Sequence, residues 1–231
     1  MRAGVPGILA VCFVAAHASP VLCQERKAVA ASAPAAFARP APAVITQAVN
    51  SLLVAVKDLA RDDSSMPPFA RERIAWITAG QRAGTLSLVL LNDPSGANLS
   101  QDALMASGDA DGRQVIVISR PRFAAFLLED GRAVPPFSRR QRNDFLLGLV
   151  HETVHLERSV SHTPFTLEDR LCEEERAWRS VDVNVVRSLL AHAEPMNPRF
   201  IEADQAIRSC GDQQPCQPLR TLLTQSEIAR R

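Results

Sequence analysis

The sequence predicts a mainly helical α+β domain that contains a small sheet. Apolar residues recur at intervals of three and four over residues 44–61, which is the spacing of an amphipathic helix. Two short runs rich in β-favouring residues, TLSLVLL at 85–91 and RQVIVISR at 113–120, are bounded by turn-forming residues and predict strands. Two helix-start signals in the second half of the chain predict further long helices.

Length and charge set limits on the class of protein. The chain has 231 residues, and its 26 basic residues nearly balance its 25 acidic residues. This length suffices for one domain with a sizeable core. The near-neutral charge argues against nucleic acid or an anionic membrane surface as the main partner.

The N-terminus has the pattern of a secretory signal peptide over residues 1–18. Arg2 precedes an apolar stretch from Val5 to Ala16, and Ala16-His17-Ala18 places small residues where a cleavage site requires them. The apolar stretch is short for a bilayer, no later segment looks long enough, and we therefore expect no membrane span. The expected location is secreted or periplasmic.

Residues 19–43 are rich in alanine and proline, which suits a flexible or polyproline-like linker and leaves residues 44–231 as the folded domain. A lipoprotein anchor at Cys23 is the alternative targeting signal. Leu22, which precedes it, is larger than the residue expected at that position.

Further elements follow along the domain. Residues 71–78 predict a short helix or a helix-to-strand junction, and residues 121–130 predict another helix. Between the two strands, NDPSGA at 92–97 and SGDADG at 107–112 are turn-forming clusters. The second cluster is not expected to bind calcium, because the EF-hand pattern and its terminal glutamate are missing.

Two capping boxes mark where the long helices begin. SRRQ at 138–141 opens a helix that is expected to run through about residue 158. TLED at 166–169 opens another, expected to run to about residue 191. The tail is expected to add one or two helices around a short cysteine-bounded loop.

Export would make the cysteines of the mature chain potential disulfides. Cys23, Cys172, Cys210 and Cys216 remain after residue 18 and allow three pairings. The loop from Cys210 to Cys216 is short and rich in turn residues, so this pair is expected first. Elimination then leaves Cys23 with Cys172.

The first long helix contains the motif His-Glu-Thr-Val-His, which places His151 and His155 four residues apart. Residues at this spacing share one helix face, so the two imidazoles can converge on one metal ion. At about 100° per residue, Asp144, Gly148 and Glu152 share their arc, while apolar residues take most of the remainder. A helix that is apolar nearly all round is buried, and buried histidines need partners, which a metal supplies.

A catalytic zinc site needs a third protein ligand. The arrangement H-E-x-x-H-x-x-G-x-x-H fails, because Arg158 and Ser161 occupy its glycine and last histidine positions. CEEERAW at 172–178 supplies three glutamates, and Glu174 fills a gap in the apolar stripe of its helix, so its carboxylate should face the histidines. A salt bridge to an arginine such as Arg158 is the alternative. The stripe consists of Leu167, Leu171, Trp178, Val181 and Val185.

HETVH, followed on the next helix by an E-x-x-A-W motif that begins at Glu174, resembles the gluzincin zinc metallopeptidases. The resemblance covers about residues 138–190 and implies a zincin-like minimal metallopeptidase domain, with an active-site helix followed by a glutamate-bearing helix. It implies that His151, His155 and Glu174 bind Zn²⁺. It also implies that Glu152 is the general base that acts on zinc-bound water.

Two features depart from that family. Thermolysin-like members carry an aspartate four residues after the ligand glutamate; here that residue is Trp178, so Asp144 or Asp182 would have to orient a histidine. The chain also contains no tyrosine, so His162, His192 or an arginine would have to stabilise the oxyanion.

The expected function is hydrolysis of peptide bonds in a peptide or protein substrate by an exported zinc metallopeptidase. The resemblance implies that a strand at 113–120 pairs with extended substrate, and an ordinary core strand is the alternative. Arginines at 139, 140 and 142 are unfavourable for the helix dipole and are either solvated surface or a contact for acidic substrates. A catalytically inactive zinc-binding domain and an exported interaction domain without metal are the other classes, and the oligomeric state is unknown.

Overall fold

The part of the chain that the computed structural model describes comprises residues 41–62, 66–92, 104–110, 112–129, 134–157 and 166–228. It is mainly helical and contains a three-stranded mixed sheet, which confirms the predicted α+β class. The predicted signal peptide and nearly all of the predicted linker lie outside these residues.

The described elements follow the chain in a simple order. The strands are β1 (Leu86–Leu91), β2 (Met105–Ala110) and β3 (Arg113–Ser119). The helices are α1 (Pro42–Asp62), α2 (Pro68–Ala83), α3 (Arg120–Glu129), α4 (Arg139–Leu156), α5 (Leu167–Val181), the π-helix η2 (Asp182–Val186), α6 (Arg187–Ala191), α7 (Pro198–Cys210) and α8 (Gln217–Ile228).

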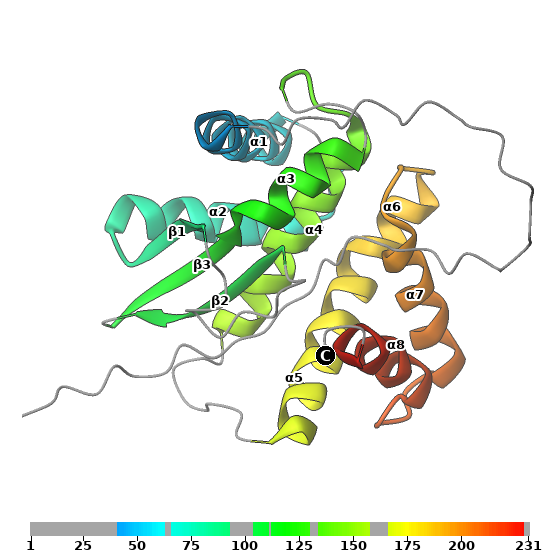
Figure 1. The fold of residues 1–231 in the computed structure, drawn as a ribbon. Helices are drawn as coiled ribbons and strands as arrows, with labels where there is room; N and C mark the ends of the chain where they lie inside the picture. The colour runs from blue at the N-terminus through cyan, green and yellow to red at the C-terminus, as the bar shows by residue number, and fades with distance from the viewer. Residues whose placement is uncertain are drawn as a thin grey trace, which may run out of the picture.

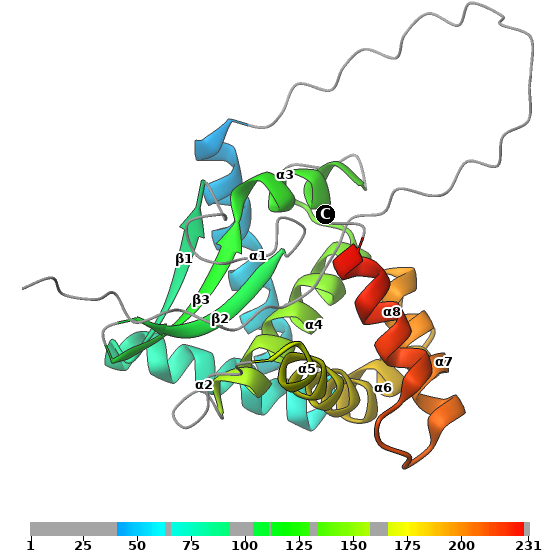
Figure 2. The ribbon, with the colours of Figure 1, turned by 60° about the horizontal axis from the view of Figure 1, so that its bottom comes forward.

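Helices α4 and α5 lie at the centre of the molecule and pack against each other. The sheet lies beside α4, and α1 and α2 also contact this helix. Helices α6, α7 and α8 lie on the other side of α5 from the sheet, as two views of the ribbon show (Figures 1 and 2). The second half of α4 is therefore enclosed by the sheet, by α2 and by α5.

Strand β3 is the central strand of the sheet. It pairs in parallel with β1, with Leu88 opposite Ile116, and antiparallel with β2, with Ser107 opposite Ile116. The face that carries Met105, Ile116 and Ile118 joins the main core, and the other face forms a small cluster of its own. Both edges of β3 are thus used by neighbouring strands.

One local prediction about this sheet was wrong. SGDADG at 107–112 was expected to be a turn, but its first four residues belong to β2. Pairing with β3 in a hairpin outweighs the low strand propensity of these residues, because β-propensity depends strongly on context. The turn is confined to the end of the motif, where Gly112 has φ 74° and donates its N–H to Asp109 Oδ1 at 3.0 Å. NDPSGA lies almost wholly outside the described residues.

Helix α1 covers one side of the core. Its buried residues recur at helical spacing, as predicted, and are Ile45, Ala48, Val49, Leu52 and Val56. By length and composition its span Pro42–Arg61 is also apolar enough to cross a membrane, contrary to the expectation that no later segment is long enough. The buried face of α1 packs on α2, α3 and α4, and 28% of the apolar window is buried in these contacts and elsewhere in the molecule.

The two predicted capping boxes are present. The Ser138 hydroxyl accepts from Gln141 N–H and the Gln141 side chain accepts from Ser138 N–H, and Thr166 and Asp169 repeat this arrangement. Each pair satisfies two backbone donors that the helix leaves free. Helix α4 ends at Leu156, close to the predicted end.

The second long helix is not one continuous α-helix. It changes to a π-helix at Asp182 and resumes as α6 after Val186. The wider turn is closed by Arg187 N–H, which donates to the Asp182 carbonyl, and by an ion pair of 2.9 Å between Arg187 Nη2 and Asp182 Oδ2. Because a π-turn inserts one residue, the helical faces before and after it are offset.

The predicted disulfide between Cys210 and Cys216 is present and joins the end of α7 to the start of α8. Cys172 is an exposed free cysteine on α5, with its Sγ 3.0 Å from Arg220 Nη2. Its predicted partner, Cys23, lies outside the described residues.

Candidate metal centre

Helix α4 carries both histidines of the motif in a fully buried segment. Every residue from Phe145 to Leu156 is buried, and His151 and His155 are 3% and 7% exposed. The sequence predicted this burial from the apolar residues that surround the helix. Two imidazoles are therefore withdrawn from water on one helical face.

Helix α5 brings a carboxylate to the same point. Glu174 is 7% exposed, and its Oε2 and Oε1 lie 3.4 Å and 3.5 Å from the Nε2 atoms of His151 and His155. The two Nε2 atoms are 3.2 Å apart. The three side chains that the sequence analysis selected as ligands thus form one buried cluster, which we call the His–His–Glu cluster.

The spacing of the donor atoms fits a small tetrahedral metal ion. Zinc binds imidazole nitrogen and carboxylate oxygen at about 2.0–2.2 Å, and tetrahedral bonds of that length place neighbouring ligand atoms about 3.3 Å apart. The Nε2–Nε2 separation of 3.2 Å is close to that value, and Glu174 lies 3.4 Å from one Nε2 through its Oε2 and 3.5 Å from the other through its Oε1. The cluster could therefore hold a metal ion, and its donor set suits zinc among other divalent metals.

The two histidines differ in their electrostatic surroundings. Burial lowers the pKa of His151, but the hydrogen bond and charge of Glu174 and the charge of Glu152 outweigh burial, so the pKa is raised above its ordinary value. Burial, the charge of His151 and the charge of Arg176 hold the pKa of His155 well below its ordinary value. The neutral form of His155, which is the form that binds metal, is favoured by its site.

Glu152, the predicted general base, is 2% exposed and follows His151 directly on α4. Its charge contributes to the raised pKa of His151, which places the carboxylate in the electrostatic environment of the cluster. Residues one apart on a helix point about 100° from each other, so Glu152 flanks the cluster beside the three donor side chains.

Trp178 lies four residues after Glu174 and contacts one of the two histidines. The indole packs edge-on against the His151 ring, with ring centroids 5.3 Å apart, and it also contacts Phe200 on α7. Among the described residues, no acceptor is present for the indole Nε1–H. Trp178 therefore restrains the His151 ring by packing, and its spacing of four from Glu174 is the sequence signal for that contact.

Arg176 is a site residue that sequence reasoning did not single out. Its Nη2 donates to the Val154 carbonyl at 3.2 Å and to Glu173 Oε2 at 2.7 Å, which joins α5 to α4 beside the histidines. Its charge lowers the pKa of both histidines. Nothing in the local sequence distinguishes Arg176 from the other arginines, because its role depends on how the helices pack.

The neighbouring glutamate, Glu175, is buried for a different reason. Its carboxylate accepts from Arg220 Nε at 2.9 Å, from Arg179 Nε at 3.1 Å and from Cys216 N–H at 2.9 Å. These contacts tie α5 to α8 and to the disulfide loop. Of the three consecutive glutamates, Glu173 is therefore partly exposed, Glu174 belongs to the cluster and Glu175 joins α5 to α8.

The other predicted site residues lie in different contacts. Asp144 accepts a hydrogen bond of 2.7 Å from Asn197 N–H, and Asp182 pairs with Arg187. His192 is exposed at the end of α6, and its Nδ1 lies 2.8 Å from the Ser188 carbonyl oxygen. His162, like Arg158, lies outside the described residues.

Strand β3 was expected to pair with an extended substrate, and that expectation is wrong. Its two edges are occupied by β1 and β2, so its backbone groups are already paired. The alternative interpretation, an ordinary core strand, is the one that the structure supports.

Asp182 provides a pH-dependent prediction. Burial raises its pKa to about 6, with hydrogen bonding and repulsion from Asp204 adding to the rise against the attraction of Arg187. An acid with a raised pKa in the folded state stabilises the fold below its unfolded pKa of about 4, and this contribution is lost as the pH rises through about 6.

We expect Asp182→Asn to remove this loss. We expect the free energy of unfolding in urea to fall between pH 4 and pH 7 by up to about 3 kcal/mol more for the parent protein than for the variant. The titrations of the histidines are common to both proteins and cancel in the difference. Parallel stability curves for the two proteins would contradict the prediction.

The chain matches no protein-family model, and no curated protein or solved structure matches it significantly. The fold and the site define a mainly helical α+β protein with a buried His–His–Glu cluster between two central helices.

Proposed function

We propose that the protein is a zinc-dependent metallopeptidase with a zincin-like domain of the gluzincin type. The observation that carries this proposal is the meeting of His151, His155 and Glu174 at zinc-ligand spacing, with Glu152 beside them. The three donors come from two helices, and Glu174 lies 19 positions after His155, so their meeting is a property of the fold. A metal bound by three protein side chains keeps a position for substrate or water, which is typical of catalytic zinc sites.

In this proposal each residue of the site has one task. His151, His155 and Glu174 would hold zinc, which when bound polarises a carbonyl and promotes ionisation of water. Glu152 would accept a proton from the attacking water and return it to the leaving amine. Trp178 would hold the ring of His151, and Arg176 would hold α5 against the backbone of α4 beside the histidines.

An extended peptide would bind at the exposed end of β2. Among the described strands, β2 pairs only with β3, and Met105 to Gly108 are buried, so Asp109 and Ala110 form the accessible part of its other edge. Helix α4 packs against β2, which places this edge near the helix that carries the histidines. Backbone hydrogen bonds to a sheet edge bind peptides with little regard to sequence, and a peptide or protein substrate would suit this edge.

A second candidate function is zinc binding without hydrolysis. The chain contains no tyrosine to stabilise an oxyanion, and an indole stands where a carboxylate would orient a histidine. Export to a secreted or periplasmic location remains part of both proposals, and the disulfide between Cys210 and Cys216 is compatible with it.

Hydrolysis of a library of internally quenched fluorescent peptides tests the proposed activity. The zinc-loaded protein should cleave a subset of the library, lose this activity on treatment with a chelator and regain it when zinc is restored. If zinc is bound but the library stays intact, the second candidate function replaces the first.

A further inference from the structure

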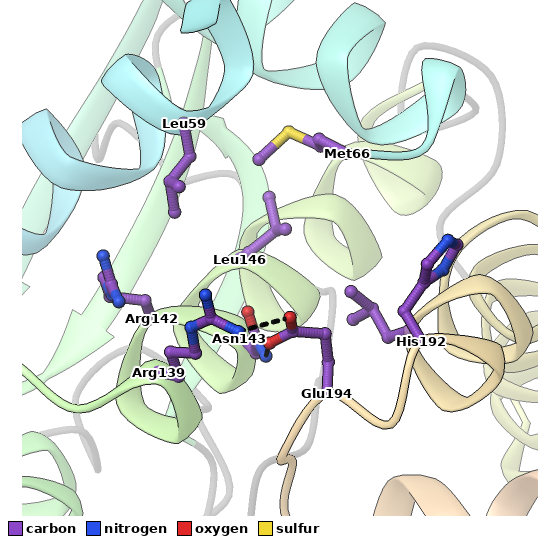
Figure 3. A pocket seen from close by; sticks show the side chains of 9 residues that line it. Leu59, Met66, Arg139, Arg142, Asn143, Leu146, His192 and Glu194 are labelled. Atoms are coloured by element: carbon purple, nitrogen blue, oxygen red, sulfur yellow. Dashed lines mark hydrogen bonds and ion pairs between the residues drawn. The ribbon is translucent and has the colours of Figure 1, made fainter. Parts of the chain in front are cut away.

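A separate pocket lies at the start of α4, away from the His–His–Glu cluster. Its volume is about 150 Å³, and it is formed between α1, the first turns of α4 and the end of α6 (Figure 3). The residues that α4 contributes, at positions 139, 142, 143 and 146, precede the histidines on the helix. We call it the α4 pocket.

One side of the α4 pocket is apolar. Leu59 of α1, Met66 before α2, Leu146 of α4 and Leu189 of α6 contribute the apolar surface. The volume exceeds the roughly 30 Å³ that one water occupies in the liquid, so the pocket has room for a small branched aliphatic group.

The other side of the pocket contains cations. Arg139 and Arg142 both line it, and Glu194 is the carboxylate that lies among them. Glu194 is already engaged, because Arg139 Nη1 lies 2.9 Å from its Oε1 and Asn143 Nδ2 lies 3.4 Å from its Oε2. In Figure 3, Arg142 lies at one edge of the pocket and His192 at the opposite edge.

Arg142 differs from its two neighbours in what it contacts. Arg140 is 3.4 Å from Glu129 and 3.5 Å from Asp144, and Arg139 pairs with Glu194. Arg142 lines the pocket, and in the described part of the chain no carboxylate pairs with it. An anion in the pocket would supply the partner that this guanidinium lacks.

The three arginines of this segment lie at the start of a helix. Three arginines in the first turn of α4 are unfavourable for the helix dipole, which favours anions at that end. Two of the three are compensated by carboxylates of the chain. An anionic group in the α4 pocket would compensate the third.

We propose that the α4 pocket binds a carboxylate that carries a short branched aliphatic group. Arg142 donates to the carboxylate, and the aliphatic group lies against the four apolar side chains. A free aliphatic carboxylate and the C-terminal residue of a peptide share this chemistry. The proposal does not depend on metal binding or hydrolysis, because the pocket uses none of the cluster residues.

Calorimetric titration with 4-methylpentanoate and with N-acetyl-leucine tests this proposal. At least one should bind saturably with a Kd of about 1 mM or tighter. Binding of N-acetyl-leucine alone identifies a peptide C-terminus as the source, and binding of 4-methylpentanoate identifies a free carboxylate. The neutral amide 4-methylpentanamide should bind at least about tenfold more weakly than its acid, because a charge-assisted hydrogen bond is lost.

Arg142→Gln should weaken binding of the same probes by about tenfold to a hundredfold. Arg140→Gln is the matched control, since it removes an arginine from the same turn that does not line the pocket, and it should leave the affinity unchanged. Circular dichroism and thermal unfolding establish that both variants are folded. Equal binding by the amide and the acid, equal binding by the Arg142 variant and the parent, or saturable binding of neither probe would overturn the proposal.

Discussion

Replacing Glu152 with glutamine is expected to leave the metal content unchanged and to lower the rate of peptide hydrolysis by about two to four orders of magnitude. Glutamine preserves the size of the buried side chain but cannot accept a proton at the pH of the reaction. The donor atoms of the His–His–Glu cluster are untouched. The measurement is kcat on a peptide that the parent cleaves, together with the zinc content of both proteins.

Glu157→Gln is a suitable control for that experiment. Glu157 follows α4 directly, is half exposed and pairs with Arg73. Its replacement should change kcat little, since its carboxylate lies on the surface. A Glu152→Gln variant that hydrolyses peptides at the parental rate would remove Glu152 from the proposed mechanism.

Removal of the metal is expected to destabilise the fold. A ligand that binds only the folded state adds about 4 kcal/mol of stability when its free concentration is one thousand times its Kd. Without a metal, two histidines and a glutamate remain buried together, with the pKa of His151 raised and the pKa of His155 lowered by the site. The free energy of unfolding should therefore rise with zinc concentration.

Glu174→Ala separates this effect from general binding of zinc to the surface. The variant should unfold at the same denaturant concentration with and without added zinc, whereas Glu152→Gln should respond to zinc as the parent does. A parent protein whose unfolding is insensitive to both zinc and chelator would show that the cluster is held by hydrogen bonds alone.

Local signals in the sequence predicted the elements that build the site. The capping boxes at 138–141 and 166–169 set the starts of α4 and α5, and helical periodicity then placed both histidines and Glu174 on faces that meet. These inferences succeed because capping and periodicity act within a few residues of the chain.

Features that depend on packing between distant segments were not predictable in the same way. Residues 107–110 are of types that favour turns, and they form a strand because they pair with β3. Leu167 was placed on the apolar stripe of α5 but is 51% exposed, since it belongs to the first turn of that helix. Arg176 gains its place beside the histidines from the crossing of two helices, which no local pattern encodes.

The metal content of the protein, exposed to zinc and then freed of loosely bound ions, tests the central claim most directly. We predict one zinc per chain in the parent and in Glu173→Ala, which removes the adjacent, partly exposed glutamate. We predict loss of that zinc in His151→Ala and in Glu174→Ala. A parent protein without bound metal, or a Glu174→Ala variant that keeps one zinc per chain, would contradict the assignment of the cluster.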